Sequence, residues 1–354
     1  MHTIRHSLPL IALTAITWTD TAGAQPLDFV TVGAPGNADA SLQDFPMLDQ
    51  IRVGPIGRVD YEFRIMRTEV TTSQWLEFVE AYTPFYSGTF PQAVNDWGLQ
   101  GLNLYSATGN DADPQWFMFP GSDRHAADVS WVHATRFCNW LHNGKVNAAW
   151  AFETGAYDTS TYADQGAGIW TGQNQRSPDA RFWIPSLDEW TKAMFYDPNK
   201  FGPGVGGYNA YPTGSDIAPV SGLPGTPNAT TSVNLGPDRF DVGSYPTAAS
   251  PWGLLDGSGG LREMVEWDGL PPGQLGGMSR GTSNSSFFPD IEDRLDFSIG
   301  GGGFATFSTS GLRLAASVPS PPAFLVFVSV IVVHASRRRK LNESFQVCHV
   351  GSAR

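Results

Sequence analysis

The chain has very few cysteines, since only Cys138 and Cys348 occur among its 354 residues. Two thiols are too few for the disulfide framework of a small secreted scaffold or for a cysteine zinc site. Basic residues are also scarce, with 22 Lys and Arg against 34 Asp and Glu, for a formal charge of −12. Because an acidic surface repels phosphate backbones, we expect no nucleic-acid partner.

Several common sequence signatures are missing as well. We find no internal repeat, no heptads and no His-Glu-x-x-His motif. The glycines of residues 204–207 and 300–303 lack the Lys-Ser/Thr pair of a phosphate-binding loop. Apolar residues nevertheless make up 41% of the chain and aromatic residues 12%, which is enough to build a core. With 39 Gly and 26 Pro, we expect one loop-rich globular domain over residues 27–316.

Residues 1–24 have the pattern of a secretory signal peptide. Basic residues near the start precede an apolar run, Leu8 to Trp18, and the small residues Ala22-Gly23-Ala24 end it. A buried N-terminal helix is the alternative, but nothing polar alternates within the run. We therefore predict export.

Residues 318–340, near the other end of the chain, have the pattern of a sorting signal. A proline-rich motif, Val318 to Pro322, precedes an apolar stretch, Ala323 to Val333, and the basic cluster Arg337 to Lys340. The stretch is shorter than the ~20 residues of a usual spanning helix, but its basic flank agrees with the positive-inside rule. The order resembles the bacterial PEP-CTERM sorting signal, which implies an exosortase-type processing protease. A plain membrane anchor is the alternative, and residues 341–354 form a tail.

Three helix starts are predicted between these ends. Thr71 and Gln74 form a capping box, followed by a face of Trp75, Phe78, Val79 and Tyr82. Ser130 is the expected cap of a second helix with a buried stripe that includes Cys138, which we interpret as a small core residue rather than a reactive thiol. Ser186 and Glu189 form a second capping box.

These helices carry a resemblance to a known family. The segments Glu69-Val70-Thr71, Val129-Ser130-Trp131 and Phe137 to Leu141 are similar to successive motifs of the formylglycine-generating enzyme, or sulfatase-modifying factor, superfamily. Further motifs follow in the same order, and they are Arg181 to Ala193, Tyr211 to Gly214, Val242 to Pro246, Trp252 to Met264, Arg280 to Asn284 and Gly311 to Ala315. The resemblance implies an α+β fold, a loop-rich variant of the C-type lectin fold with few helices and short strands.

The resemblance also implies a site that this chain does not complete. Oxidising members of the family hold copper through two cysteines, which correspond approximately to Ser286 and Ile291 here, and neither side chain supplies a thiolate. The iron-binding branch uses histidines of an additional N-terminal domain, for which we expect no room. We do not expect His125, His133 and His142 to converge on one metal, and we interpret each as a lone exposed histidine. We therefore expect no copper, no iron and no catalytic residue.

Calcium, in a structural role, is the one metal that the resemblance favours. The family often holds calcium near a Gly-Asn-x-x-Glu turn, and here Glu263 keeps the carboxylate while Gly260 stands at the Asn position. Asp256 adds a second carboxylate of the kind that calcium prefers. We predict a possible calcium site at Asp256, Gly260 and Glu263. The acidic loops of an acidic protein are the alternative interpretation.

Two functions stay open at this point. The first is an exported, surface-tethered, non-catalytic module that binds a glycan or a protein through aromatic loops, for example Trp97 to Phe119 and Trp150 to Trp170. The second is a secreted metal- or oxygen-dependent oxidoreductase that uses a site without cysteine. We favour the first, located in the cell envelope or outside the cell.

Overall fold

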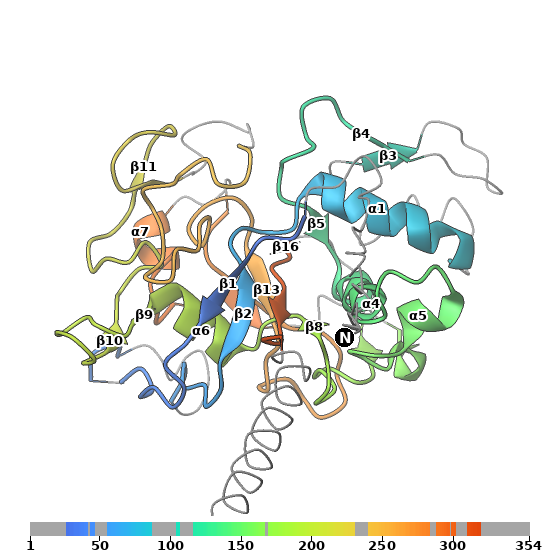
Figure 1. Ribbon diagram of the computed structural model, residues 1–354, viewed down its shortest axis with the longest axis horizontal. Coiled ribbons are helices and arrows are strands. Elements are labelled where there is room, and N and C mark those ends of the chain that lie inside the picture. The colour runs from blue at the N-terminus through green and yellow to red at the C-terminus, as the bar shows by residue number, and fades with distance from the viewer. Residues whose placement is uncertain are drawn as a thin grey trace, which may run out of the picture.

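Two short-stranded sheets occupy the centre of the molecule (Figure 1). The computed structural model describes residues 26–41, 43–46, 55–86, 104–106, 116–166, 169–230, 240–283, 288–297, 299–301 and 310–319. One sheet has four strands in the order β1 (Phe29–Val32), β2 (Phe63–Met66), β17 (Ala315–Ala316) and β8 (Phe182–Trp183). All its strand pairs are antiparallel. The first and last strands of the described domain therefore lie together, joined by β2.

The second sheet has five strands within the described residues. Their order is β15 (Ile299–Gly301), β14 (Met278–Arg280), β13 (Glu263–Val265), β16 (Ser310–Gly311) and β5 (Asp128–Val129). In this sheet β13 and β16 run parallel, and the other pairs are antiparallel. Strands of two to four residues have few ladder hydrogen bonds, so side-chain contacts must hold the sheets in place.

Two-stranded ribbons complete the strands of the described chain. They are β9 with β10 (Tyr196–Asp197 and Gly207–Tyr208), β11 with β12 (Val220–Ser221 and Ala229–Thr230), β3 with β4 (Leu104–Ser106 and Trp116–Met118), and β6 with β7 (Ala163–Asp164 and Trp170–Thr171). The α-helices are α1 (Thr72–Tyr82), α4 (Trp131–His142), α5 (Ala149–Glu153), α6 (Leu187–Phe195) and α7 (Pro289–Glu292). Two short 3₁₀ helices, η2 (Thr83–Phe85) and η3 (Thr159–Thr161), lie between them.

Helices α1, α4 and α5 cover one side of the sheets, and α6 and α7 lie on the other side with β9 to β11 (Figure 1). An aromatic cluster joins the first three helices. The ring of Phe78 on α1 lies 5.4 Å from Phe137 on α4 and 6.1 Å from Phe152 on α5, measured between ring centroids. These rings are fully buried, so the cluster is the apolar core on this side.

The sequence predicted the helix starts well. Thr71 with Gln74, and Ser186 with Glu189, form both hydrogen bonds of a capping box, as expected. Ser130 does precede α4, but its side chain makes no capping bond, because its hydroxyl pairs with Nδ1 of His133 at 3.0 Å. The prediction of Ser130 as a side-chain cap was therefore wrong.

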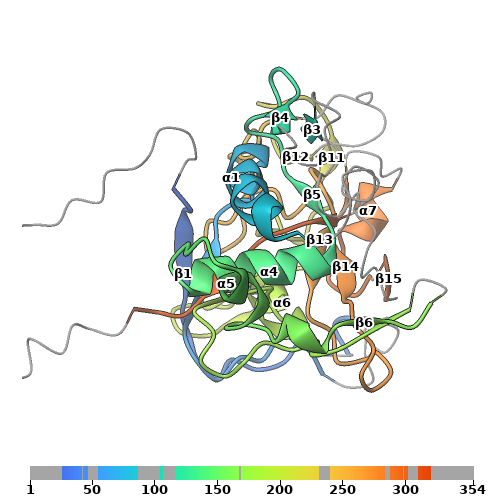
Figure 2. The same ribbon diagram turned by 90° about the vertical axis from the view of Figure 1, so that its right-hand side faces the viewer.

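Both ends of the described chain leave the molecule on the same side, beside β1 and β17 (Figure 2). The predicted signal peptide, the apolar C-terminal stretch and the tail lie outside the described residues. Within the described part of the chain, no helix is long and apolar enough to cross a membrane.

Candidate functional site

The strongest polar contact in the core is the ion pair between Glu263 on β13 and Arg313. Arg313 Nη2 lies 2.6 Å from Glu263 Oε1, and Arg313 Nε lies 2.8 Å from Oε2. Trp190 on α6 donates its indole N–H to the same Oε2 at 2.7 Å. Both oxygens of this carboxylate are thus committed to protein donors in a fully buried setting.

Two further carboxylates, Glu69 and Asp256, lie around this ion pair. Burial raises the pKa of Glu69 well above its usual range, and the carboxylates of Asp256 and Glu263 raise it further. Burial also raises the pKa of Asp256 to about 6, although the Gly243 N–H donates to it. One guanidinium therefore faces three acidic groups, and the surroundings favour a protonated Glu69.

Gly260 leaves the room that Glu69 needs. Its φ is +66°, and a Cβ added there would stand 2.7 Å from Glu69 Oε1. The same Oε1 accepts the N–H of Leu261 at 3.1 Å, while Oε2 has no hydrogen-bond partner in the described structure. A side chain at position 260 is therefore incompatible with the present place of Glu69.

The calcium prediction at Asp256, Gly260 and Glu263 can be compared with these contacts. The structure brings the three residues into one polar region, but Glu263 is engaged by Arg313 and Trp190, and Asp256 accepts the Gly243 N–H. Among the described residues, no group of three or more His, Cys, Asp or Glu could hold a metal ion. Calcium stays a prediction of the sequence, and the donor set does not fit it.

Glu263 lies on the strand β13, and Glu266 follows directly after it. Residues three apart on extended backbone point to opposite faces. Accordingly Glu266 Oε1 accepts the Tyr157 hydroxyl at 2.6 Å and the Arg176 N–H at 2.9 Å, away from Arg313. The two carboxylates therefore form no acid/base pair.

The positions that correspond to the copper-binding cysteines supply no soft donor. Ser286 lies outside the described residues, and Ile291 is an exposed residue of α7. Cys138 is fully buried on α4, where burial raises its thiol pKa well above the usual range. Cys138 is therefore a core residue, as predicted. The residues at the two copper positions do not fit a copper ion held by thiolates.

The three histidines do not converge on a site, and none of them is exposed as expected, because His133 is buried and His125 and His142 are half-buried. His133 is 2% exposed, and burial lowers its pKa well below the usual value. His142 Nδ1 accepts the Arg181 N–H at 3.1 Å, and His125 Nε2 faces Asp241 at 4.0 Å. Each ring has a local structural partner.

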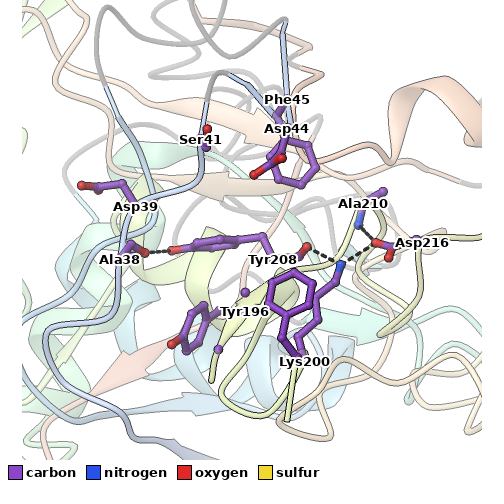
Figure 3. Close-up of a pocket in the computed structure, with 13 residues that line it drawn as sticks. Ala38, Asp39, Ser41, Asp44, Phe45, Tyr196, Lys200, Tyr208, Ala210 and Asp216 are labelled. Atoms are coloured by element: carbon purple, nitrogen blue, oxygen red, sulfur yellow. Dashed lines mark hydrogen bonds and ion pairs between the residues drawn. The ribbon is translucent and has the colours of Figure 1, made fainter. Parts of the chain in front are cut away.

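A pocket with a volume of about 420 Å³ opens elsewhere, between residues 38–45 and the β9–β10 ribbon with the loop after it (Figure 3). Its lining residues are Ala38, Asp39, Ser41, Asp44, Phe45, Tyr196, Lys200, Phe201, Gly206, Gly207, Tyr208, Ala210 and Asp216. This volume lies near the lower end of the range for small-molecule sites.

Tyr208 occupies the middle of this pocket (Figure 3). Its hydroxyl donates to the Ala38 carbonyl at 3.0 Å and accepts the Asn37 side-chain amide at 2.8 Å. Its ring meets the Tyr196 ring edge-on, with 5.2 Å between centroids. Because these contacts fix the ring from both segments, the pocket has a preformed aromatic wall.

The one cation among these described lining residues is already neutralised. Lys200 Nζ donates to the Tyr208 carbonyl and lies 2.7 Å from Asp216 Oδ1. Burial alone would raise the pKa of Asp216, but the hydrogen bonds from Lys200 and from the Ala210 N–H lower it below its usual value. Lys200 is therefore committed to Asp216, and the lining offers no cation to the carboxylates of Asp39 and Asp44.

Two adjacent glycines let the aromatic rings approach the backbone. A Cβ at Gly206 would overlap the Tyr196 hydroxyl, and one at Gly207 would stand 2.5 Å from the Phe201 ring. The sequence of this glycine run excludes a phosphate-binding loop and indicates no other role by itself. Its position between two tyrosines and a phenylalanine was the available signal for the pocket.

The aromatic side chains of the loops that we expected to bind a ligand differ in how far they are exposed to solvent. Trp116 is buried and donates to Thr83 at 2.8 Å, whereas Phe117 and Phe119 are about half exposed. Trp150 is 56% exposed, and Trp97 lies outside the described residues. None of these residues lines the pocket of Figure 3.

Comparison with known proteins supports the fold. The sequence profile of the sulfatase-modifying factor enzyme 1-like domain matches residues 34–316. No curated protein matches the chain. One similar solved structure is that of CarF, which is 20% identical in sequence; the match covers 83% of this chain and 99% of CarF, with a TM-score of 0.46. Another is that of Treponema denticola variable protein 1, which is 18% identical; the match covers 86% of this chain and 100% of that protein, with a TM-score of 0.48. The α+β, loop-rich architecture with few helices and short strands is confirmed.

Thermal unfolding distinguishes the ion-paired turn from a calcium-held one. Because Glu263 is satisfied by Arg313 and Trp190, we expect the same melting temperature in excess EDTA and in excess calcium chloride, measured by circular dichroism. A calcium ion bound only to the folded state would raise the melting temperature as its concentration increases, and that result would contradict the ion-pair account.

The buried Glu266 predicts a pH dependence of stability. Burial raises the pKa of Glu266 from its ordinary 4.5 to about 8, so the folded state holds this proton more tightly than the unfolded state does. Its contribution to the free energy of unfolding is present below pH 4.5 and is lost as the pH rises toward about 8, by at most about 1.4 kcal/mol per pH unit.

We therefore expect the free energy of unfolding of the Glu266→Gln variant to decrease less than that of the parent chain between about pH 5 and about pH 8. Chemical denaturation at several pH values measures this, with the exposed Glu62→Gln as the control that keeps the parent slope. An identical slope for Glu266→Gln and the parent chain would mean that Glu266 is already ionised when folded.

Proposed function

We propose that this chain, which belongs to the sulfatase-modifying factor enzyme 1-like domain family, is a non-catalytic module that binds a ligand in the pocket of residues 38–45 and 196–216. The residue types at the family's copper positions support the first part of the proposal. Ile291 offers no metal donor, and the sequence has no cysteine between residues 139 and 347. The scaffold thus lacks the thiolates with which the oxidising relatives are expected to work.

The pocket carries the second part of the proposal. Its aromatic wall is held by hydrogen bonds that involve no ligand, so the shape exists before binding. A preformed concave site loses less conformational entropy on binding than a loop that must become ordered. A short glycan, or a protein partner that inserts one side chain, is the ligand that we expect for such a module.

We further propose that the module is exported and tethered to the cell envelope. The apolar run of residues 8–18 and the order of proline motif, apolar stretch and basic cluster after residue 317 support this proposal. Both described ends leave on one side of the domain, so both segments would extend from that side (Figure 2). An exosortase-type protease is the expected processing partner of the C-terminal segment.

A pocket-filling substitution tests the function. We expect the full chain to retain ligands from arrays of glycans and of short peptides, and Ala210→Phe to lose at least tenfold in affinity because its ring occupies the space of the ligand. The matched control is Ala163→Phe, which adds the same ring at an exposed position of β6, outside the lining.

Biolayer interferometry with the retained ligand measures both variants, and circular dichroism checks that both are folded. Equal affinity of Ala210→Phe and Ala163→Phe would contradict the proposed site. Failure of the parent chain to retain any glycan or peptide would contradict the proposed function itself.

A further inference from the structure

We infer that the pocket of residues 38–45 and 196–216 selects an organic cation, an ammonium or guanidinium group at the end of a short hydrocarbon stem. The inference rests on the proposed function and adds the chemical class of the ligand. Three properties of the lining carry it, namely its charge, its aromatic surfaces and its size.

The charge of the lining is negative. The lining contains three carboxylates, Asp39, Asp44 and Asp216, and one cation, Lys200, which is paired with Asp216 at 2.7 Å. Within the described residues, neither Asp39 nor Asp44 takes part in an ion pair. The lining thus has two carboxylates without a protein counter-ion, and an anionic ligand would be repelled by both.

These carboxylates surround the central ring instead of converging on one point. Figure 3 shows Asp39 at one side of Tyr208, Asp44 above it, and Asp216 beyond Lys200 at the other side. A small metal ion needs several oxygens within its coordination distance, and no such group occurs among the described residues. An alkylammonium or guanidinium group, which donates hydrogen bonds to one or two carboxylates and needs no shell of several oxygens, suits this arrangement better.

The aromatic surfaces suit the hydrocarbon stem and the charge together. The lining includes the rings of Phe45, Tyr196, Tyr208 and Phe201, and aromatic faces attract ammonium and guanidinium groups. Lys200 Nζ lies 5.8 Å from the centroid of the Phe201 ring, so this ring already has one cation beside it. The hydroxyls of a neutral sugar could donate to the two carboxylates, but they would leave the negative charge of the lining without a counter-ion.

The size of the pocket limits the ligand. A volume of about 420 Å³ accepts one long side chain or one small amine, but not a folded peptide segment or a long oligosaccharide. The same chemistry is offered by a free alkylamine and by the Lys or Arg side chain of a partner protein. The experiment must therefore distinguish these two sources.

Isothermal titration calorimetry of the full chain in mild detergent, at low salt, tests the inference with two matched pairs of probes. The first pair is n-pentylammonium and its neutral analogue pentanol. The second pair is N-acetyl-lysine amide and its neutral analogue N-acetyl-norleucine amide. We expect each cation to bind at least tenfold more tightly than its neutral partner and to weaken as salt screens the carboxylates.

Charge-neutralising variants locate the effect. We expect Asp39→Asn and Asp44→Asn each to weaken binding of the cation about threefold to fivefold, and the double variant about tenfold or more, which is the range for partly exposed charge pairs. The control Asp123→Asn removes one exposed carboxylate outside the lining, and we expect less than a twofold change from its distant charge.

The outcomes separate the two proposals. Binding of n-pentylammonium alone identifies a free amine as the source, and binding of the lysine amide alone identifies a protein side chain. If the neutral analogues bind as tightly as the cations and Ala210→Phe abolishes both, the cation inference is wrong while the proposed function stands. If cations bind but Ala210→Phe changes nothing, the pocket is not the site and both proposals are wrong.

Discussion

The buried ion pair of Arg313 and Glu263 is the contact on which the rest of the domain depends. Arg313 stands between β16 and β17, and it also donates to the carbonyls of Met66 on β2 and of Leu255. Glu263 on β13 receives in addition the indole N–H of Trp190 on α6. One guanidinium and one carboxylate therefore connect the two sheets with a helix, in a fold whose described strands are only two to four residues long. Removal of one partner alone would leave a buried charge without a counter-ion, which generally costs several kcal/mol.

This ion pair also decides what the neighbouring turn can do. The carboxylate that the family resemblance assigned to calcium is used by Arg313, and the position expected to be Asn is a glycine whose space Glu69 occupies. The acidic groups that remain are buried, and burial raises the pKa of Glu69 well above its usual range and that of Asp256 to about 6. The polar centre of the domain thus stabilises the fold, and the binding site that we propose lies away from it.

The sequence predicted what depends on neighbours along the chain. The capping boxes at Thr71 and Ser186 and the buried stripe of α4 involve residues three or four positions apart, and their patterns are direct consequences of helix geometry. The family motifs then supplied the overall architecture. Ser130 escaped prediction because His133 competes for its hydroxyl. The pairs of β2 with β1 and with β17 join segments that are far apart along the chain, since Phe29 lies opposite Met66 and Ala315 lies opposite Ile65, and no local pattern specifies such pairs. The pocket escaped for the same reason, since Asn37 and Tyr208 meet across 171 positions.

The account makes one central claim: the ligand of this domain lies against Tyr208, outside the polar centre around Arg313. A crystal structure of the full chain grown with excess N-acetyl-lysine amide tests it most directly. We predict electron density for the ammonium near Asp39 and Asp44, with the stem along the Tyr208 ring and the Arg313–Glu263 pair unchanged. Density for the ligand or for a metal ion among Glu69, Asp256 and Glu263, with an empty pocket at Tyr208, would contradict the account.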